Sequence, residues 1–324
     1  MYLVKERFNL RNNLALTRTL ILQTLSKPEL CLGTAQFGMA YGVTNSKGKV
    51  SESEVKRILC RAQISNIRWL DTAQAYGDSE SVLGSCFNTS HKFKIVSKLA
   101  PQYQNTFSAS DEDIWDQSLK ITCGHLGISR LDALLIHASE DLRKPGSEYL
   151  ERWLLGLRER DIVERIGVSI YRSEDLEGLN LDVLDIVQLP LSLFDQRLIN
   201  DGTVSRLKDR GIAVHARSIY LQGLLLTPYE RWPKWFDPTV RSQQKALEEL
   251  ASERSCQLID LALGFVRAQT ELEVALIGLN SLPDLIELEK AWSRSTPWSE
   301  NEWKSWGIST GESLDPRRWP KTTL

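Results

Sequence analysis

Eight short runs of aliphatic and β-branched residues recur along the chain, separated by polar segments whose apolar residues have helical spacing. Most runs are apolar without alternation, which is typical of strands buried on both faces. The predicted strands are 31–36, 67–73, 93–99, 131–137, 165–170, 183–189, 212–218 and 274–279. The predicted helices are 51–64, 78–87, 111–126, 147–160, 201–210, 242–254, 260–268 and 281–292. This alternation predicts an α/β protein with a (β/α)8 TIM barrel, although a doubly wound open sheet would show the same pattern.

Local signals mark the ends of two predicted helices. Ser51 precedes the helix 51–64 and Glu54 follows three residues later, which is the pattern of a capping box. Gly211 follows Arg210, where a glycine is expected to end the helix 201–210.

Three segments lie outside the repeat. Residues 1–29 are predicted to form an appended amphipathic helix rather than a transit peptide, and residues 30–292 a single barrel domain. Residues 220–240 form an irregular aromatic loop before the last strand. A tail over 293–324 is expected near the substrate face of the barrel, or else merely packed on its helices. Its tryptophans are Trp298, Trp303, Trp306 and Trp319.

Composition narrows the class of partner. The 324 residues include 40 Lys and Arg against 42 Asp and Glu, a formal net charge of −2. Phosphate neutralisation needs a basic excess, so a general nucleic-acid binder is disfavoured. No apolar run approaches the 18 residues of a membrane span. The five cysteines form no C-x-x-C pair, which predicts no disulfide framework and a cytoplasmic location. A small-molecule partner remains, and the oligomeric state cannot be predicted from these features.

Several catalytic motifs are missing. No G-x-G-x-x-G occurs, and the segment 33–38 has Walker-like spacing without the required Lys and Ser or Thr. Gly167-Val-Ser169 lacks the last glycine of a nucleophile elbow. The histidines and cysteines show no metal-ligand spacing. P-loop phosphotransfer, elbow-type acyl transfer and a helix-borne zinc site are therefore disfavoured, and no metal site is predicted.

Four titratable side chains follow consecutive predicted strands. Asp71, Lys98 and His137 stand at the ends of the second, third and fourth, and Tyr76 follows Asp71 in the next loop. In a TIM barrel these ends meet on the catalytic face. A lysine held by a carboxylate is expected to lower the pKa of the phenol, and a histidine can hydrogen-bond a substrate oxygen. Together they predict a proton donor for a carbonyl, or a base for an alcohol.

Each of the four has an ordinary structural interpretation when taken alone. Asp71 would cap a turn, Tyr76 would be a half-buried loop aromatic, and Lys98 would be solvated. His137 would be a core histidine with its hydrogen bonds satisfied. The prediction depends on finding all four at neighbouring strand ends.

At these residues the sequence resembles the aldo-keto reductase superfamily. The resemblance is carried by LGTAQFG (32–38), LDTAQAYGDSESVLG (70–84), IVSKLAP (95–101), LLIHAS (134–139), IGVSIYRSEDLE (166–177), VQLPLSLFDQR (187–197), HARSIYLQGLLL (215–226) and ALIGLNSLPDLIE (275–287). The HARSxYLQGLLL form is similar to a bacterial branch often associated with sugars. The family implies a (β/α)8 barrel that binds NADP(H), sometimes NAD(H). Its catalytic tetrad corresponds to Asp71, Tyr76, Lys98 and His137.

The resemblance also implies cofactor contacts near the nicotinamide and the pyrophosphate. The family's serine–asparagine pair appears as Ser169-Ile170, and its nicotinamide-stacking aromatic appears as Arg217, which can stack or bind pyrophosphate. The positions expected to contact the cofactor here are Gly33, Thr34, Ser169, Gln188, Arg217, Ser218, Leu221 and Gly223.

The adenosine-ribose contacts are expected at the last strand and the helix after it. These positions are Gly278, Leu279, Asn280, Ser281, Asp284 and Glu287. No basic residue follows Gly278 until Lys290, whereas a 2′-phosphate is usually bound by arginine. NADP(H) is predicted first, because backbone and Ser or Asn groups also bind phosphate, and NAD(H) is a second possibility.

The predicted function is the NAD(P)H-dependent reduction of an aldehyde or ketone, including a sugar-derived carbonyl, with Tyr76 as general acid. One alternative is a cofactor-sensing or partner-binding barrel with little turnover, suggested by the missing asparagine and by Arg217. Another is a metal-free lyase or isomerase that needs no nicotinamide.

Overall fold

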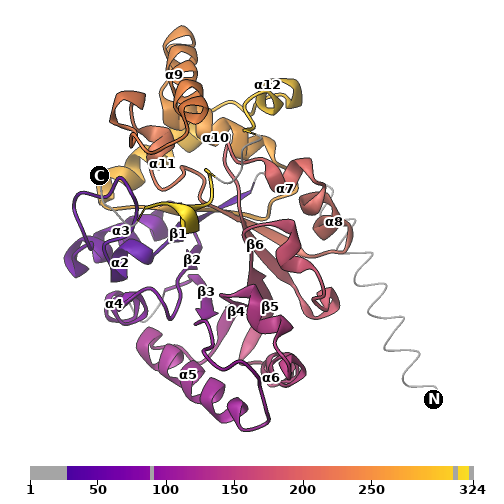
Figure 1. The fold of residues 1–324 in the computed structure, drawn as a ribbon. Helices are drawn as coiled ribbons and strands as arrows, with labels where there is room; N and C mark the ends of the chain where they lie inside the picture. The colour runs from indigo at the N-terminus through magenta and orange to yellow at the C-terminus, as the bar shows by residue number, and fades with distance from the viewer. Residues whose placement is uncertain (1–27, 88–90, 309–312, 321–324) are drawn as a thin grey trace, which may run out of the picture.

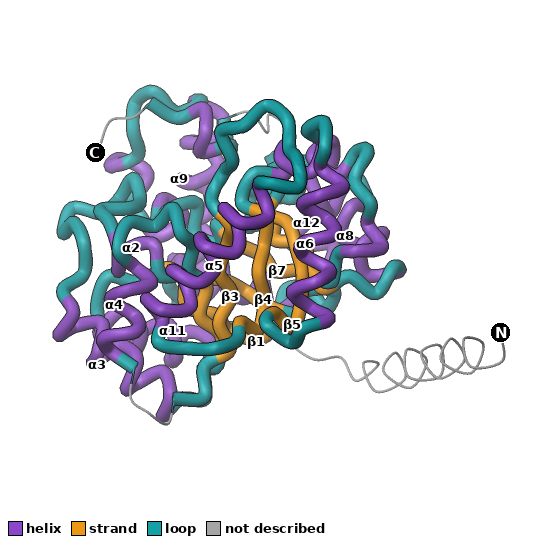
Figure 2. The backbone as a smooth tube through the Cα atoms, turned by 90° about the horizontal axis from the view of Figure 1, so that it is seen from below, coloured by secondary structure: helices purple, strands orange, loops and turns teal. Residues whose placement is uncertain are grey.

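Eight parallel strands close into a barrel surrounded by helices (Figures 1 and 2). This computed structural model describes residues 28–87, 91–308 and 313–320. The strands follow one another around the barrel in chain order, and the last pairs with the first, Val274–Gly278 alongside Glu29–Gly33. This closure confirms the TIM-barrel prediction and excludes the open sheet.

The strands are β1 (Glu29–Gly33), β2 (Trp69–Asp71), β3 (Lys94–Leu99), β4 (Leu131–Ile136), β5 (Val163–Ser169), β6 (Ile186–Pro190), β7 (Ala213–Arg217) and β8 (Val274–Gly278). The α-helices are α2 (Ala35–Gly38), α3 (Glu52–Ile64), α4 (Ser79–Cys86), α5 (Asp111–Leu126), α6 (Ser147–Glu159), α7 (Arg197–Asn200), α8 (Thr203–Asp209), α9 (Pro238–Glu253), α10 (Leu258–Ala268), α11 (Leu282–Arg294) and α12 (Glu300–Lys304). Short 3-10 turns include η1 (Ser139–Arg143), η2 (Ser173–Leu176), η3 (Leu181–Val183), η4 (Leu224–Leu226), η5 (Tyr229–Arg231) and η6 (Pro316–Arg318).

Each predicted strand and helix overlaps an observed one, and the differences lie at the ends. The first predicted strand was placed over 31–36, but β1 ends at Gly33. The backbone N–H of Thr34 donates to the Asp71 carbonyl, and the Met39 N–H then closes a helical turn onto Ala35. Residues 35–38 therefore form the short helix α2, which turns the chain away from the strand.

The predicted helix boundary signals are partly as expected. The Ser51 side chain accepts a hydrogen bond from the Glu54 backbone N–H, as an N-cap should. The Glu54 carboxylate does not complete a capping box, and instead accepts from the Leu282 N–H at the start of α11, at 2.6 Å. Gly211 follows α8 with a φ of 74°, so the predicted helix stop is confirmed.

The strands bury both of their faces. Leu32, Leu70 and Ile95 belong to the large cluster packed against the helices. The alternate residues Cys31 and Trp69 belong to a separate inner cluster, which also contains Val96, Ala133, Leu135, Ile186, Val274 and Leu276. Because side chains alternate along a strand, the next inward positions toward the carboxyl ends form one ring. That ring contains Gly33, Asp71, Lys98, His137, Ser169, Gln188, Arg217 and Gly278.

A charged group fills the opposite end of the barrel interior. Glu273 accepts from Arg165 at 2.8 Å and from the buried His215 at 3.2 Å. Burial lowers the pKa of His215, so a neutral imidazole donates to Glu273. Burial opposes the change at Glu273, but the His215 hydrogen bond and the Arg165 charge lower its pKa to about 2. The charges of Arg165 and Glu273 therefore compensate each other at this end of the barrel.

The tail tryptophans mostly pack on the barrel's outer parts. Trp298 lies against Gly264 of α10, and Trp303 makes an edge contact with Phe265 at 5.7 Å between ring centroids. Trp319 lies on Phe236 of the loop before α9, at 5.2 Å. The packing interpretation therefore holds for these three. Most of the predicted N-terminal extension, residues 1–27, lies outside the described residues.

All five cysteines are free thiols in the structure. Within the described ranges, no helix is long and apolar enough to cross a membrane.

Candidate active site

A buried ion pair stands at the carboxyl ends of β2 and β3. The Lys98 Nζ lies 2.5 Å from the Asp71 Oδ1 and 2.9 Å from the Thr72 carbonyl oxygen. Lys98 is fully buried and Asp71 is 2% exposed, so the pair has little solvent to screen it. The second Asp71 oxygen accepts from the Gln188 Nε2 of β6 at 2.7 Å. Asp71 thus holds two side chains from other strands.

Tyr76 and His137 lie together above this pair. The Lys98 Nζ is 5.0 Å from the centroid of the Tyr76 ring. The His137 ring meets the Tyr76 ring edge-on at 5.7 Å between centroids. The structure therefore brings together the four side chains that the sequence singled out.

Close backbone contact fixes the loop that carries Tyr76. Gly38 of α2 approaches so closely that a Cβ there would lie 1.8 Å from the Tyr76 carbonyl oxygen. Gly77 has a φ of 59°, and a Cβ there would meet the Gly38 carbonyl oxygen at 2.4 Å. The Tyr76 N–H also donates to the Ala73 carbonyl at 3.0 Å. Two glycines without side-chain bulk therefore set the position of the phenol.

The Tyr76 phenol differs from the expectation. Burial raises its pKa well above the ordinary value, and the Asp71 charge raises it further. The shift of the Tyr76 pKa is therefore opposite to the expected lowering, and the cation that opposes it is Arg217. Tyr76 is therefore a neutral phenol at physiological pH and carries the proton that a donor needs.

The His137 imidazole is neutral. Burial lowers its pKa to about 3, helped by the positive charges of Lys98 and Arg217. Its Nδ1 is buried without a hydrogen-bond partner. A neutral imidazole still has one N–H, so His137 can donate a hydrogen bond but has no second proton to give.

The positions expected to contact the nicotinamide differ in which of their polar atoms are still free to bind a ligand. Gly33 and Ser169 end β1 and β5, on the same rim as the ion pair. The Gln188 amide has only its nitrogen engaged, and its Oε1 is buried without a partner. Thr34 is committed elsewhere, since both its N–H and its hydroxyl donate to the Asp71 carbonyl. Thr34 thus positions Asp71.

The loop after β7 has an unusual backbone. Ser218, Leu221 and Gln222 all have positive φ, and so does Gly223 at 94°. A Cβ on Gly223 would lie 2.0 Å from the Thr44 Oγ1. Such conformations concentrate where a loop is shaped around a ligand. The expected pyrophosphate positions Ser218, Leu221 and Gly223 therefore share one constrained loop.

The expected ribose positions surround the start of α11. Ser281 is the N-cap and accepts from the Asp284 N–H, while Asp284 accepts from the Asn280 N–H at 2.9 Å. The Asn280 Oδ1 is buried without a partner. Glu287 forms an ion pair with Arg294, with 2.7 Å between its Oε1 and the Arg294 Nη2. Gly278 ends β8 and is exposed.

Comparison with known proteins decides the family. The model of the aldo/keto reductase family matches residues 29–307, which includes all eight strands. The chain belongs to this family. Aldo/keto reductases are NAD(P)-dependent oxidoreductases, and the present chain is one of them.

Two curated relatives are similar in sequence to this aldo/keto reductase. It is 25% identical to L-galactose dehydrogenase of Arabidopsis thaliana over 287 residues, covering 82% of the chain and 86% of that protein. It is 31% identical to an aldo-keto reductase of Mycolicibacterium smegmatis over 141 residues. That match spans 41% of the chain and 45% of the relative.

Solved aldo/keto reductases share the fold. One from Bacillus halodurans, in a holo form, has a TM-score of 0.65 at 16% identity, covering 91% of the chain and 94% of its own. A putative one from Pseudomonas aeruginosa has a TM-score of 0.61 at 19% identity, covering 84% and 92%.

The rim residues of this aldo/keto reductase fit a nicotinamide dinucleotide. Buried polar atoms normally have hydrogen-bond partners, so the unpartnered Oε1 of Gln188 and Oδ1 of Asn280 point to a polar ligand. A Cβ on Gly33 would be in ordinary van der Waals contact with the Ile277 carbonyl oxygen, at 3.7 Å, so the rim is not overcrowded there.

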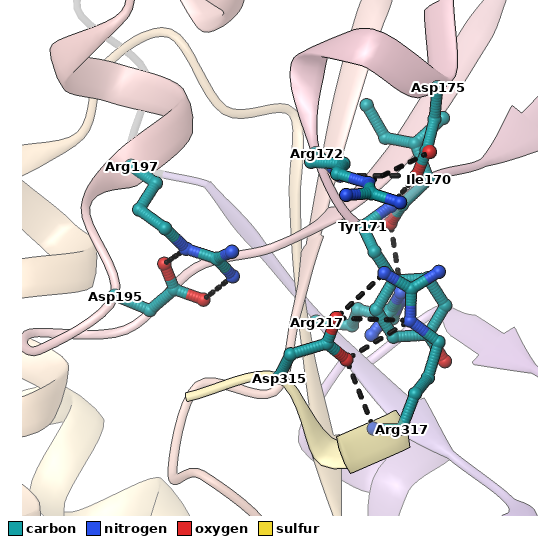
Figure 3. Close-up of polar contacts among 9 residues, drawn as sticks. All are labelled: Ile170, Tyr171, Arg172, Asp175, Asp195, Arg197, Arg217, Asp315 and Arg317. Carbon is teal, nitrogen blue, oxygen red and sulfur yellow. Dashed lines mark hydrogen bonds and ion pairs between the residues drawn. The ribbon is translucent and has the colours of Figure 1, made fainter. Parts of the chain in front are cut away.

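The sequence analysis missed Tyr171 and Arg317. Tyr171 follows β5 two residues after Ser169, and the guanidinium carbon of Arg217 lies 4.1 Å from its ring centroid. Arg317 of the tail lies 3.9 Å from the same centroid (Figure 3). Tyr171 could have been found by the same strand-end argument that found His137. Nothing in the sequence places Arg317 there.

Proposed function

We propose that this enzyme reduces an aldehyde or ketone to the alcohol, with Tyr76 as the proton donor. The observation that carries the proposal is the buried Lys98–Asp71 pair beneath a neutral Tyr76 and a neutral His137. His137 donates a hydrogen bond to the carbonyl oxygen and orients it. Tyr76 then transfers its proton to that oxygen as negative charge develops.

The remaining groups hold the reacting parts in place. NAD(P)H, when bound, supplies the hydride. Ser169 and the free Gln188 Oε1 hold the carboxamide of the nicotinamide, and the constrained loop at Ser218, Leu221 and Gly223 holds the phosphates. Asp71 holds both Lys98, which lies beneath the proton donor Tyr76, and Gln188, which belongs to the proposed cofactor site.

The groups near the expected ribose shift the cofactor preference. The sequence favoured NADP(H) first. In the structure the Asn280 and Leu282 N–H groups already donate to the carboxylates of Asp284 and Glu54. A 2′-phosphate near them would meet negative charge, whereas ribose hydroxyls can donate to carboxylates. We expect NAD(H) to be used at least as well as NADP(H).

The substrate is proposed to be a sugar-derived carbonyl. The relative named L-galactose dehydrogenase aligns with most of both chains, and its name denotes a sugar substrate. A general test is to follow the oxidation of NADH and of NADPH with a panel of aldoses, ketoses, simple aldehydes and ketones. Turnover of at least one carbonyl, with the alcohol recovered in equal amount, supports the proposal. Tight cofactor binding without turnover of any would favour a sensor.

The neutral state of His137 predicts a particular pH dependence. Because its pKa is lowered to about 3, the imidazole does not titrate above pH 5. With an uncharged aldehyde, kcat/KM is expected to show no histidine inflection between about pH 5.5 and 8. A pH–rate profile measures this. A tenfold change centred near pH 6.5 would mean that the imidazolium takes part.

A further inference from the structure

Arg217 ends β7 on the rim of the site and is firmly held there. Its Nη2 donates to the Ile170 carbonyl at 2.9 Å, and its guanidinium carbon lies 4.1 Å from the Tyr171 ring centroid (Figure 3). Its Nη1 makes a longer contact with the Ser218 Oγ at 3.4 Å. A guanidinium has five N–H donors, so these contacts leave three of them available.

The charge of Arg217 lacks a counterion. No carboxylate in the described part of the chain lies within ion-pair distance of its nitrogens, whereas the Lys98 charge is paired with Asp71. Arg317 is also paired, because it binds both oxygens of Asp315. Of these three cations, Arg217 is the one whose charge is not compensated by a carboxylate of the described residues.

A second guanidinium, that of Arg317, lies close by and repels the uncompensated charge of Arg217. Arg217 and Arg317 both lie within about 4 Å of one Tyr171 ring centroid, so their guanidinium carbons are at most about 8 Å apart, within one Debye length at physiological salt. Asp315 compensates one of the two. A single further anion at Arg217 would balance the pair.

Arg217 also acts on the reacting groups. Its positive charge lowers the pKa of His137 and opposes the rise at Tyr76. It occupies the inward position two residues beyond His215 on β7, beside Pro190 of β6. An anion bound there would lie on the same rim of the barrel as the carbonyl that Tyr76 and His137 are proposed to hold.

We propose that Arg217, stacked on Tyr171, binds a carboxylate or phosphate group of the carbonyl substrate. The substrate class is then an acidic carbonyl compound, such as a sugar acid or a sugar phosphate. This inference rests on the proposed function. The planar fork of arginine suits both groups, because two parallel N–H donors can meet two oxygens. The cofactor's pyrophosphate offers the same chemistry, and the experiment separates the two sources.

The kinetic test compares substrates that differ in charge and little in shape. The pairs are 4-formylbenzoate with 4-formylbenzamide, and glyceraldehyde 3-phosphate with glyceraldehyde. In the wild type, kcat/KM is expected to favour the anion of each pair. Arg217→Met should lower that preference about tenfold or more, mostly through the KM of the anion, and Arg217→Lys should restore part of it. Arg172→Met is the matched control, because exposed Arg172 already faces Asp175 at 3.6 Å, and it should leave the preference unchanged.

Binding measurements distinguish the sources and the possible failures. Calorimetric titration with benzoate and benzamide should show benzoate bound more tightly by the wild type and equally weakly by Arg217→Met. The Kd values for NADH and NADPH, from tryptophan fluorescence, should change little. A raised cofactor Kd with an unchanged anion preference would assign the charge to the cofactor and overturn the inference, as would no change in either. If no aldehyde were turned over, the proposed function would be wrong. The benzoate titration would still show whether Arg217 binds an anion.

Discussion

Tyr76→Phe is expected to lower kcat/KM by about 10²- to 10⁴-fold for every carbonyl substrate, which is the usual contribution of a general acid. The phenylalanine keeps the ring that packs edge-on against His137, so only the hydroxyl group with its proton is removed. The neutral His137 has no second proton with which to replace it. Steady-state rates, with circular dichroism and cofactor Kd as checks on folding and binding, measure the effect.

Tyr149→Phe is the matched control for this change. Tyr149 lies on helix α6, outside the proposed site, and its ring stacks on Arg152, a contact that phenylalanine keeps. The control should retain its rate within about threefold, because the same atom is removed from a position that holds neither substrate nor cofactor. If Tyr76→Phe turned over substrate as fast as Tyr149→Phe, the proton would have to come from another group.

Breaking the buried ion pair should have the largest effect on stability. Lys98→Met leaves the Asp71 carboxylate buried with only the Gln188 amide as a side-chain donor. Removing one partner of a buried pair costs about 3–5 kcal/mol. A fall of that size in the free energy of unfolding is a large part of the 5–15 kcal/mol typical of a domain. Denaturant unfolding of the wild type and variant measures it.

The double variant Asp71→Asn/Lys98→Met separates this pairing from simple loss of packing. With both charges removed, no uncompensated ion is buried. The double variant should therefore lose less free energy of unfolding than the two single variants lose together. The surface pair Arg68–Glu29 is the control. Its side chains are 45% and 43% exposed, and Glu29→Gln should cost about 1 kcal/mol or less. Additive effects at Asp71 and Lys98 would contradict an energetic coupling between them.

The fold was predictable because its signal is local and repeated. Runs without alternation, such as 131–137, indicate strands buried on both faces, and their eightfold recurrence with helices favoured the barrel over an open sheet. The tetrad followed from one further rule, that parallel strands end on the same face. Spacing alone therefore placed Asp71, Lys98 and His137 on one rim.

Features that depend on tertiary contacts could not be predicted in this way. The sequence assigned Gln188 to the nicotinamide, but its nitrogen is engaged by Asp71. The pKa of Tyr76 rises because burial and the Asp71 charge outweigh the positive charge of Arg217. Glu54 looked like half of a capping box, yet it caps a helix far along the chain at Leu282.

The tail is the clearest case of a feature without a sequence signal. Asp315 and Arg317 reach the rim through the 3-10 turn η6, and Arg317 shares the Tyr171 ring with Arg217. These residues follow the last barrel helix, where no periodic pattern indicates which loop they will contact. The sequence offered a tail near the substrate face only as one of two alternatives, and it did not indicate which loop the tail would contact.

In the proposed reaction, hydride passes from the cofactor to a carbonyl carbon while Tyr76 protonates its oxygen. An isotope experiment follows both events: the best carbonyl substrate is reduced with NADH or NADPH carrying deuterium on the transferable C4 position, and the alcohol is analysed by mass spectrometry and NMR. We expect one deuterium per molecule on the carbinol carbon with the wild type, and almost none formed by Tyr76→Phe in the same time. An alcohol whose carbinol hydrogen came from solvent, or equal labelled product from the variant, would contradict it.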